Sequence, residues 1–223
     1  MHNGGVIHNN YREHIKSINA TTLLEEIKLK DVDLGYFPET SYSINNEISN
    51  NYLQSTYTNI SLLRCVYKAR QNKLATAFEM YLRKDPYFTN PFCILCNNVI
   101  EDTKHIICDC PAYQAIRTNL TNDVSTLLKN LTHQEYHHYI ENDFPWWFSY
   151  DVVHDLNPLP NLPSPPTITL PPFLGALGYF PQEMVPFIKS MLTDKHNTTR
   201  VLNVLNNTII SYIPKLWKER NLK

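Results

Sequence analysis

Three cysteines and one histidine lie close together in this chain in a spacing typical of metal ligands. They follow the pattern C-x2-C-x8-H-x4-C and are Cys93, Cys96, His105 and Cys110. Thiolate sulfur and imidazole nitrogen are the atoms that zinc takes in closed tetrahedral sites. The spacing therefore predicts a Zn2+ site made of these four side chains. Because four protein ligands leave no open coordination position for water, we expect the site to be structural and the protein not to be an enzyme.

The fourth ligand has a competitor, Cys108. On a continuous helix Cys108 lies three residues after His105 and shares its face. Pro111, however, disfavours helical backbone at the residue before it, so the helix is expected to end at or before Cys110. We therefore favour Cys110 as the ligand, and keep Cys108 as a reserve ligand or a small buried apolar side chain.

A chance cluster and a disulfide framework account for these cysteines less well than a metal site does. The chain has only five cysteines, and four of them fall within residues 93–110, which argues against chance. The odd number of cysteines, the length of 223 residues and the lack of an apolar signal core argue against a disulfide framework. No apolar run of about 18 residues is present, so we expect no membrane span and an intracellular location, nuclear or cytoplasmic.

The residues around the ligands add a family resemblance. An acidic-Thr segment precedes the histidine, and a Cys-Pro-x-aromatic segment and an arginine follow it: Glu101–Thr103, Cys110–Tyr113 and Arg117. This pattern resembles the zinc-binding domain at the C-terminal end of reverse-transcriptase polyproteins of non-LTR retrotransposons. That family has a helical Leu-Arg segment upstream, matched here by Leu63-Arg64 with Leu74. It often has Gly where this chain has Asn97, a residue that also tolerates left-handed backbone.

The similarity covers residues 61–131, roughly a third of the chain. It implies a module that follows the polymerase, and often a ribonuclease H domain, and that helps the element to handle RNA or target DNA. The chain has no Tyr-x-Asp-Asp polymerase signature, and its acids are not clustered as two-metal phosphoryl chemistry requires. We therefore expect a retroelement-derived module that binds RNA or DNA without catalysis. The alternative is a structural or protein-interaction zinc module that binds no nucleic acid.

Positive charge is concentrated just before the predicted zinc site, although the formal net charge of the chain is −1. Residues 61–90 contain six Lys or Arg and two acidic residues. Their apolar positions recur at helical spacing, with a break near residues 71–72. If nucleic acid binds here, the predicted phosphate contacts are Arg64, Lys68, Arg70 and Lys73. A solvated helix face accounts for the same pattern equally well.

These patterns predict a mainly α fold. It consists of a helical domain with a small Cys3His zinc knuckle and a C-terminal helical unit after a Pro-rich linker. We expect a partly irregular N-terminal segment, the zinc-binding domain, an aromatic and Pro-rich linker and the C-terminal unit, at residues 1–60, 61–142, 143–172 and 173–223. In the first segment a capping box is predicted at residues 22–25, and the Asn- and Ser-rich residues 41–59 are expected to be irregular.

Two longer amphipathic helices are predicted downstream. Residues 113–131 should pack on the basic helices, and residues 197–219 should form a helix that Pro214 kinks or splits. A shorter helix should begin near residues 181–183. We expect the apolar stripe of residues 197–219 to pack on the zinc unit, or else to mediate self-association or binding to a protein partner.

Aromatic and histidine clusters have simpler interpretations. The aromatic residues at 144–148 are expected to anchor a loop on the core, because buried Trp side chains commonly do so. His133, His137 and His138 are interpreted as exposed polar residues rather than as a second metal site.

Overall fold

The computed structural model describes residues 42–53, 60–97, 99–142, 144, 146–149 and 166–222. Over these residues the protein is mainly helical, and its only β pairing consists of three isolated antiparallel bridges. The predicted fold class is therefore confirmed. The predicted capping box at residues 22–25 and most of the Pro-rich segment lie outside the described residues. In the part of the chain described here, none of the helices combines the length and the apolar character needed to cross a membrane.

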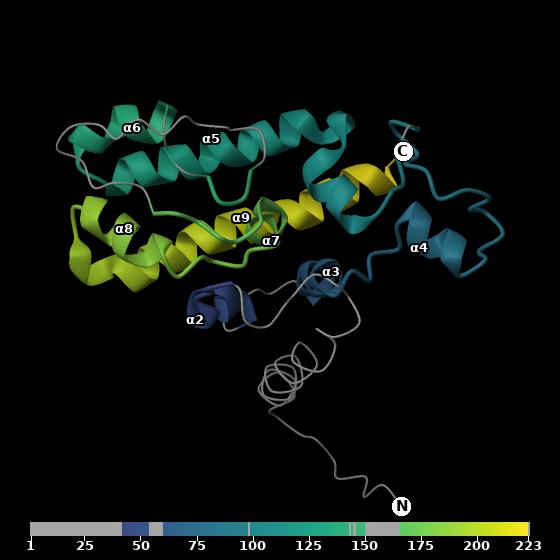
Figure 1. Cartoon of the computed structure of the whole chain (residues 1–223), viewed down its shortest axis with the longest axis horizontal. Helices are drawn as coiled ribbons and strands as arrows, with labels where there is room; N and C mark the ends of the chain where they lie inside the picture. The colour runs from purple at the N-terminus through teal and green to yellow at the C-terminus, as the bar shows by residue number, and fades with distance from the viewer. Residues whose placement is uncertain are drawn as a thin grey trace, which may run out of the picture.

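The longest helix, α9 (Thr198–Asn221), runs through the middle of the fold (Figure 1). The long helix α5 (Gln114–Leu131) packs along one side of it, and α3 (Ile60–Arg70) and α2 (Asn46–Asn50) pack along the other. One end of α9 contacts α8 (Met184–Met191). The shorter α-helices are α4 (Ala77–Leu82), α6 (His137–Asn142) and α7 (Pro172–Ala176).

This arrangement corrects one expectation about packing. The sequence predicts that the helix at residues 113–131 packs on the basic helices, but α9 lies between α5 and α3 (Figure 1). The apolar stripe of α9 is wide enough for both neighbours, because buried side chains recur every three or four residues: Val201, Leu202, Leu205, Ile209, Ile210, Ile213 and Leu216. The stripe therefore packs on the unit that contains the predicted ligands, and one continuous core extends from Ile48 to Leu216. The four segment boundaries remain a prediction.

Pro214 does not split α9, contrary to one expected outcome. The helix continues to Asn221, although proline cannot donate the hydrogen bond that would link it to the preceding turn. The buried Ile213 and Leu216 on either side of the proline anchor both halves of the helix in the core. Packing of an amphipathic face thus outweighs the local preference of one residue.

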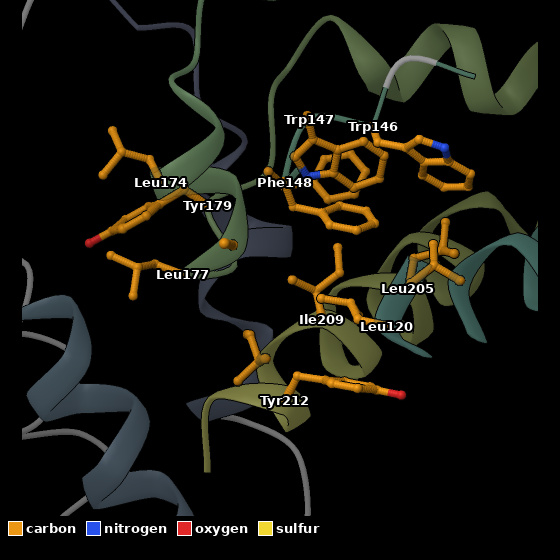
Figure 2. Packing of buried hydrophobic residues seen from close by; sticks show 14 of the residues in the cluster. Leu120, Trp146, Trp147, Phe148, Leu174, Leu177, Tyr179, Leu205, Ile209 and Tyr212 are labelled. Carbon is orange, nitrogen blue, oxygen red and sulfur yellow. The ribbon is translucent and has the colours of Figure 1, made fainter. Parts of the chain in front are cut away.

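The aromatic cluster anchors a loop on the core, as predicted. Phe144, Trp146, Trp147 and Phe148 are all buried. Figure 2 shows Phe148 beside Ile209 of α9, and the Trp147 ring packs edge-on against Phe148 with ring centroids 5.3 Å apart. Helix α7 approaches this loop so closely that a Cβ atom on Gly175 would lie 1.9 Å from the Trp147 carbonyl oxygen. Glycine is therefore required at position 175.

Part of the segment predicted to be irregular, residues 41–59, is helical: within its described residues, 42–53, the structure contains the short helix α2. Asn45 caps α2 by accepting a hydrogen bond from the Ile48 N–H at 2.9 Å. Ile48 and Tyr52 are buried against the rest of the protein, and Asn206 of α9 donates to the Ile48 carbonyl at 2.9 Å. One of the asparagines that suggested irregular structure thus acts as a helix cap here.

Candidate metal centre

The first two ligands lie on a tight turn that closes a small hairpin. The Asn97 N–H donates to the Cys93 carbonyl at 2.8 Å, and Asn97 has a φ of 57°. Asn97 therefore has left-handed backbone at the position where the zinc-binding domain that the sequence resembles often has Gly. The hairpin is held by an antiparallel bridge between Phe92 and Ile100 and by the Cys93 N–H, which donates to the Val99 carbonyl at 2.8 Å. These bonds place the side chains of Cys93 and Cys96 on the same turn.

The other two ligands lie on and just after a short π-helix, η2 (His105–Asp109). Before it, the Asp102 carboxylate accepts a hydrogen bond from the His105 N–H at 2.7 Å, as a helix-capping side chain does. At its end the Cys110 N–H donates to the His105 carbonyl at 2.7 Å, five residues back along the chain. This wide turn brings Cys110 over His105, and Cys110 itself is extended before Pro111 (φ −66°, ψ 120°).

The structure brings all four predicted ligands together. The ligand atoms of Cys93, Cys96, His105 and Cys110 all lie within 4.8 Å of one another. The two sulfurs of Cys93 and Cys110 are 3.8 Å apart, and the Cys96 sulfur is 3.3 Å from Nε2 of His105. In a tetrahedral zinc site with metal–sulfur bonds of about 2.3 Å, two sulfurs are about 3.8 Å apart. The donor set and its spacing therefore fit a tetrahedral metal ion.

The remaining cysteines and histidines stand apart from this group. Cys108, the reserve ligand, is buried but belongs to the hydrophobic core rather than to the cluster. None of the five cysteines is in a disulfide, and the 3.8 Å between Cys93 and Cys110 is well beyond a sulfur–sulfur bond of about 2.05 Å. Among the described residues, His133, His137 and His138 form no comparable group.

Burial controls the chemistry of the site. Cys93 and Cys110 are fully buried, and His105 is only 3% exposed. Burial raises the pKa of the Cys93 thiol, and it raises the pKa of the Cys110 thiol to about 12. Only thiolates bind zinc, so a cation must displace protons from these sulfurs. Through Nε2, His105 can offer a neutral ligand; its Nδ1 atom is buried and has no hydrogen-bond partner.

A buried ion pair joins the metal-ligand segment to α9. Glu101 is completely buried, and its carboxylate accepts hydrogen bonds from Nη2 and Nε of Arg220 at 2.8 and 3.2 Å. The same carboxylate accepts from the Ala77 N–H at 2.7 Å and from the Ile94 N–H at 3.4 Å. The Arg220 guanidinium also lies over the ring of Trp217, 5.2 Å from its centroid. Sequence reasoning missed this pair because its members are 119 positions apart and no local pattern connects them.

The four predicted phosphate contacts have different environments. Arg64, Lys68 and Lys73 are exposed. Arg70 is buried, and its guanidinium donates to the carbonyls of Ser49, Leu177 and Gly178, each at 2.8 Å. Arg70 therefore holds α3 against the backbone of these three residues. The prediction that Arg70 contacts phosphate is withdrawn, because its guanidinium is buried and already hydrogen-bonded.

Arg117, which is part of the family resemblance, lies beside the last ligand. Its Nη1 donates to the Cys110 carbonyl at 2.9 Å, so the backbone of the ligand is held by the first turn of α5. Comparison with known protein families, curated proteins and solved structures finds no match to this chain. Its function is therefore inferred from the geometry of the site and from the surfaces around it.

Proposed function

We propose that this chain is a zinc-binding module of retroelement ancestry that binds RNA or DNA without catalysing a reaction. The observation that carries the proposal is the convergence of Cys93, Cys96, His105 and Cys110 into one compact and largely buried group. Three thiolates and one imidazole in tetrahedral spacing favour zinc among the common biological metals. Four protein ligands also leave no coordination position for a reacting water.

The positions that carry the family resemblance support the proposed ancestry. Asp102 accepts a hydrogen bond from the His105 N–H, Asn97 adopts the left-handed backbone of the knuckle, and Arg117 binds the carbonyl of the last ligand. Glu101, in the acidic-Thr segment, pairs with Arg220 in α9. Each of these residues thus helps to shape the metal centre, as expected if they were inherited together.

Exposed basic residues in the segment that precedes the metal ligands in the sequence support nucleic-acid binding. Arg64 and Lys68 are exposed on α3, and Lys73 is exposed after it. Arg83 and Lys84 are exposed at the end of α4, where Arg83 pairs with Glu79. Since phosphate contacts release counterions, binding through these residues should weaken steeply as salt is raised.

Two measurements test the proposal. Native mass spectrometry of the reduced protein should find one zinc per chain; folded protein without metal would contradict the metal centre. Titration with RNA and with single- and double-stranded DNA at two salt concentrations should then compare the wild type with a variant in which Arg64, Lys68 and Lys73 are changed to Ala. A matched control changes the exposed Lys189, Lys195 and Arg200 to Ala. Equal affinity in the two triple variants would contradict the proposed phosphate contacts.

A protein-interaction role is the second candidate, and one observation favours it. Most of the large exposed hydrophobic side chains in the described part of the chain lie between residues 81 and 100, on α4, on the hairpin and in the segment between them: Tyr81, Leu82, Tyr87, Phe92, Ile94, Val99 and Ile100. Such concentrations are typical of protein interfaces. If a second copy binds here, light scattering should detect dimers in the wild type and only monomers after Leu82→Ser with Tyr87→Ser. Monomers in both proteins would contradict self-association.

A further inference from the structure

The Glu101 carboxylate contacts three parts of the fold that are distant in sequence. It accepts hydrogen bonds from Ile94 in the knuckle, Ala77 at the start of α4 and Arg220 in the last turn of α9. Glu101 is completely buried and Arg220 is only 7% exposed. Charged groups are rarely buried to this extent unless they are paired. The Glu101 carboxylate therefore links the last turn of α9 to the hairpin and to the start of α4.

We propose that formation of the metal centre controls docking of the last turn of α9 through the Glu101–Arg220 ion pair. This coupling rests on the metal centre proposed above. Glu101 directly follows the hairpin, and one of its carboxylate oxygens accepts a hydrogen bond from the N–H of Ile94 in the hairpin. The two ligand-bearing segments, residues 93–96 and 105–110, meet at the four ligand atoms, so an ion bound there holds the hairpin closed.

Loss of the ion removes the support that keeps Glu101 buried. When the hairpin opens, its carboxylate moves into water, because an isolated buried charge is strongly disfavoured. The Arg220 guanidinium is then left with its 3.2 Å hydrogen bond to the Asn221 side chain and its contacts with the rings of Trp217 and Phe88. A buried guanidinium without a carboxylate partner is more stable in solvent, so Arg220 becomes exposed and the last turn of α9 leaves its packed position with it.

Linkage makes the effect reciprocal. If metal binding stabilises the docked helix end, the docked helix end must strengthen metal binding by the same factor. The middle of α9 is held by a different set of contacts, since Leu205 and Ile209 are buried in the main core. The coupling is therefore local, and α5 and the middle of α9 serve as internal references.

Hydrogen exchange with mass spectrometry tests the first direction. Peptides from the full-length protein are followed with zinc bound and after chelation. We expect exchange at residues 214–222 to rise at least about tenfold on chelation, with little change in α5. If zinc binds and exchange at residues 214–222 does not rise on chelation, the coupling is overturned but the metal centre is not. If α5 loses protection as much as residues 214–222 do, chelation unfolds the whole protein and the local coupling is overturned. Protein that binds no metal would overturn the metal centre and the coupling together.

Zinc affinity in variants, measured by competition with a chelating dye, tests the reverse direction. Arg220→Met should weaken zinc binding about tenfold, within the usual range of coupling between sites. The matched control is Arg200→Met, on the exposed first turn of the same helix, which should bind like the wild type. Adding Glu101→Gln to Arg220→Met removes both charges and should restore part of the affinity. Arg220→Met with wild-type affinity, or a double variant weaker than Arg220→Met, would overturn the proposal.

Discussion

The charge pattern of α3 predicts that Arg70 contacts phosphate, but the burial of Arg70 leads to a different prediction. Replacing Arg70 with Ala should destabilise the fold strongly and leave the nucleic-acid affinity of the folded protein unchanged. Its guanidinium donates to three backbone carbonyls, those of Ser49, Leu177 and Gly178, each at 2.8 Å. A hydrogen bond to a charged group contributes about 1.5 kcal/mol or more, so we expect a loss of about 4 kcal/mol or more. Since ordinary domains are stable by about 5–15 kcal/mol, such a loss is a large fraction of the total stability.

Urea denaturation followed by circular dichroism measures this loss. The matched control is Arg64→Ala on the same helix, where an exposed side chain should change the free energy of unfolding by about 0.5 kcal/mol or less. Arg70→Lys should also destabilise, because an ammonium cannot reproduce the planar donor geometry of the guanidinium. If Arg70→Ala unfolded at the same urea concentration as Arg64→Ala, the structural role of Arg70 would be refuted.

Three further predictions concern the ligands and one turn. Cys110→Ser should abolish stoichiometric zinc binding in native mass spectrometry and Cys108→Ser should not; the opposite result would identify Cys108 as the ligand. Gly178→Ala should lower the free energy of unfolding by about 2 kcal/mol or more, because Gly178 has a φ of +79° and the new Cβ would lie 2.3 Å from Cγ1 of Ile210. Thermal melts measure this loss, and an unchanged melting temperature would contradict it. Zinc affinity should fall as the pH falls from roughly 8 to 6, because burial raises the pKa of both Cys93 and Cys110 and protons compete with the metal for the sulfurs. Calorimetry should detect about two or more protons released per metal ion bound. A zinc affinity that does not change with pH would contradict this prediction.

The sequence was most informative where local chemistry determines the structure. The spacing of the ligands predicted a group that the structure brings together, and Asn97 adopts the left-handed backbone expected of it. Helical periodicity located both ends of α5 and of α9 to within two residues. Each of these features depends on residues within a few positions of one another, so a short stretch of sequence contains the necessary information.

The sequence was least informative where the partner of a residue is remote. Arg64 and Arg70 have the same charge and lie on the same helix, yet one is exposed and the other donates to carbonyls more than a hundred positions away. The pairing of Glu101 with Arg220 depends in the same way on how α9 lies against the hairpin. Periodicity identifies the apolar face of a helix but does not identify which other element covers it, so charged residues near the edge of that face are hard to place.

The structure groups Cys110, and not Cys108, with the other three predicted ligands, but through a turn different from the one that the sequence predicts. Pro111 predicts an α-helix that ends early and frees Cys110. In the structure the chain instead widens into a π-turn, so that Cys110 is held by a hydrogen bond to the His105 carbonyl five residues back. In this wider turn the residue that stands over the histidine is five positions away rather than three or four. Cys108 consequently lies in the hydrophobic core and outside the ligand group, so one short segment supplies both a candidate metal ligand and a core residue.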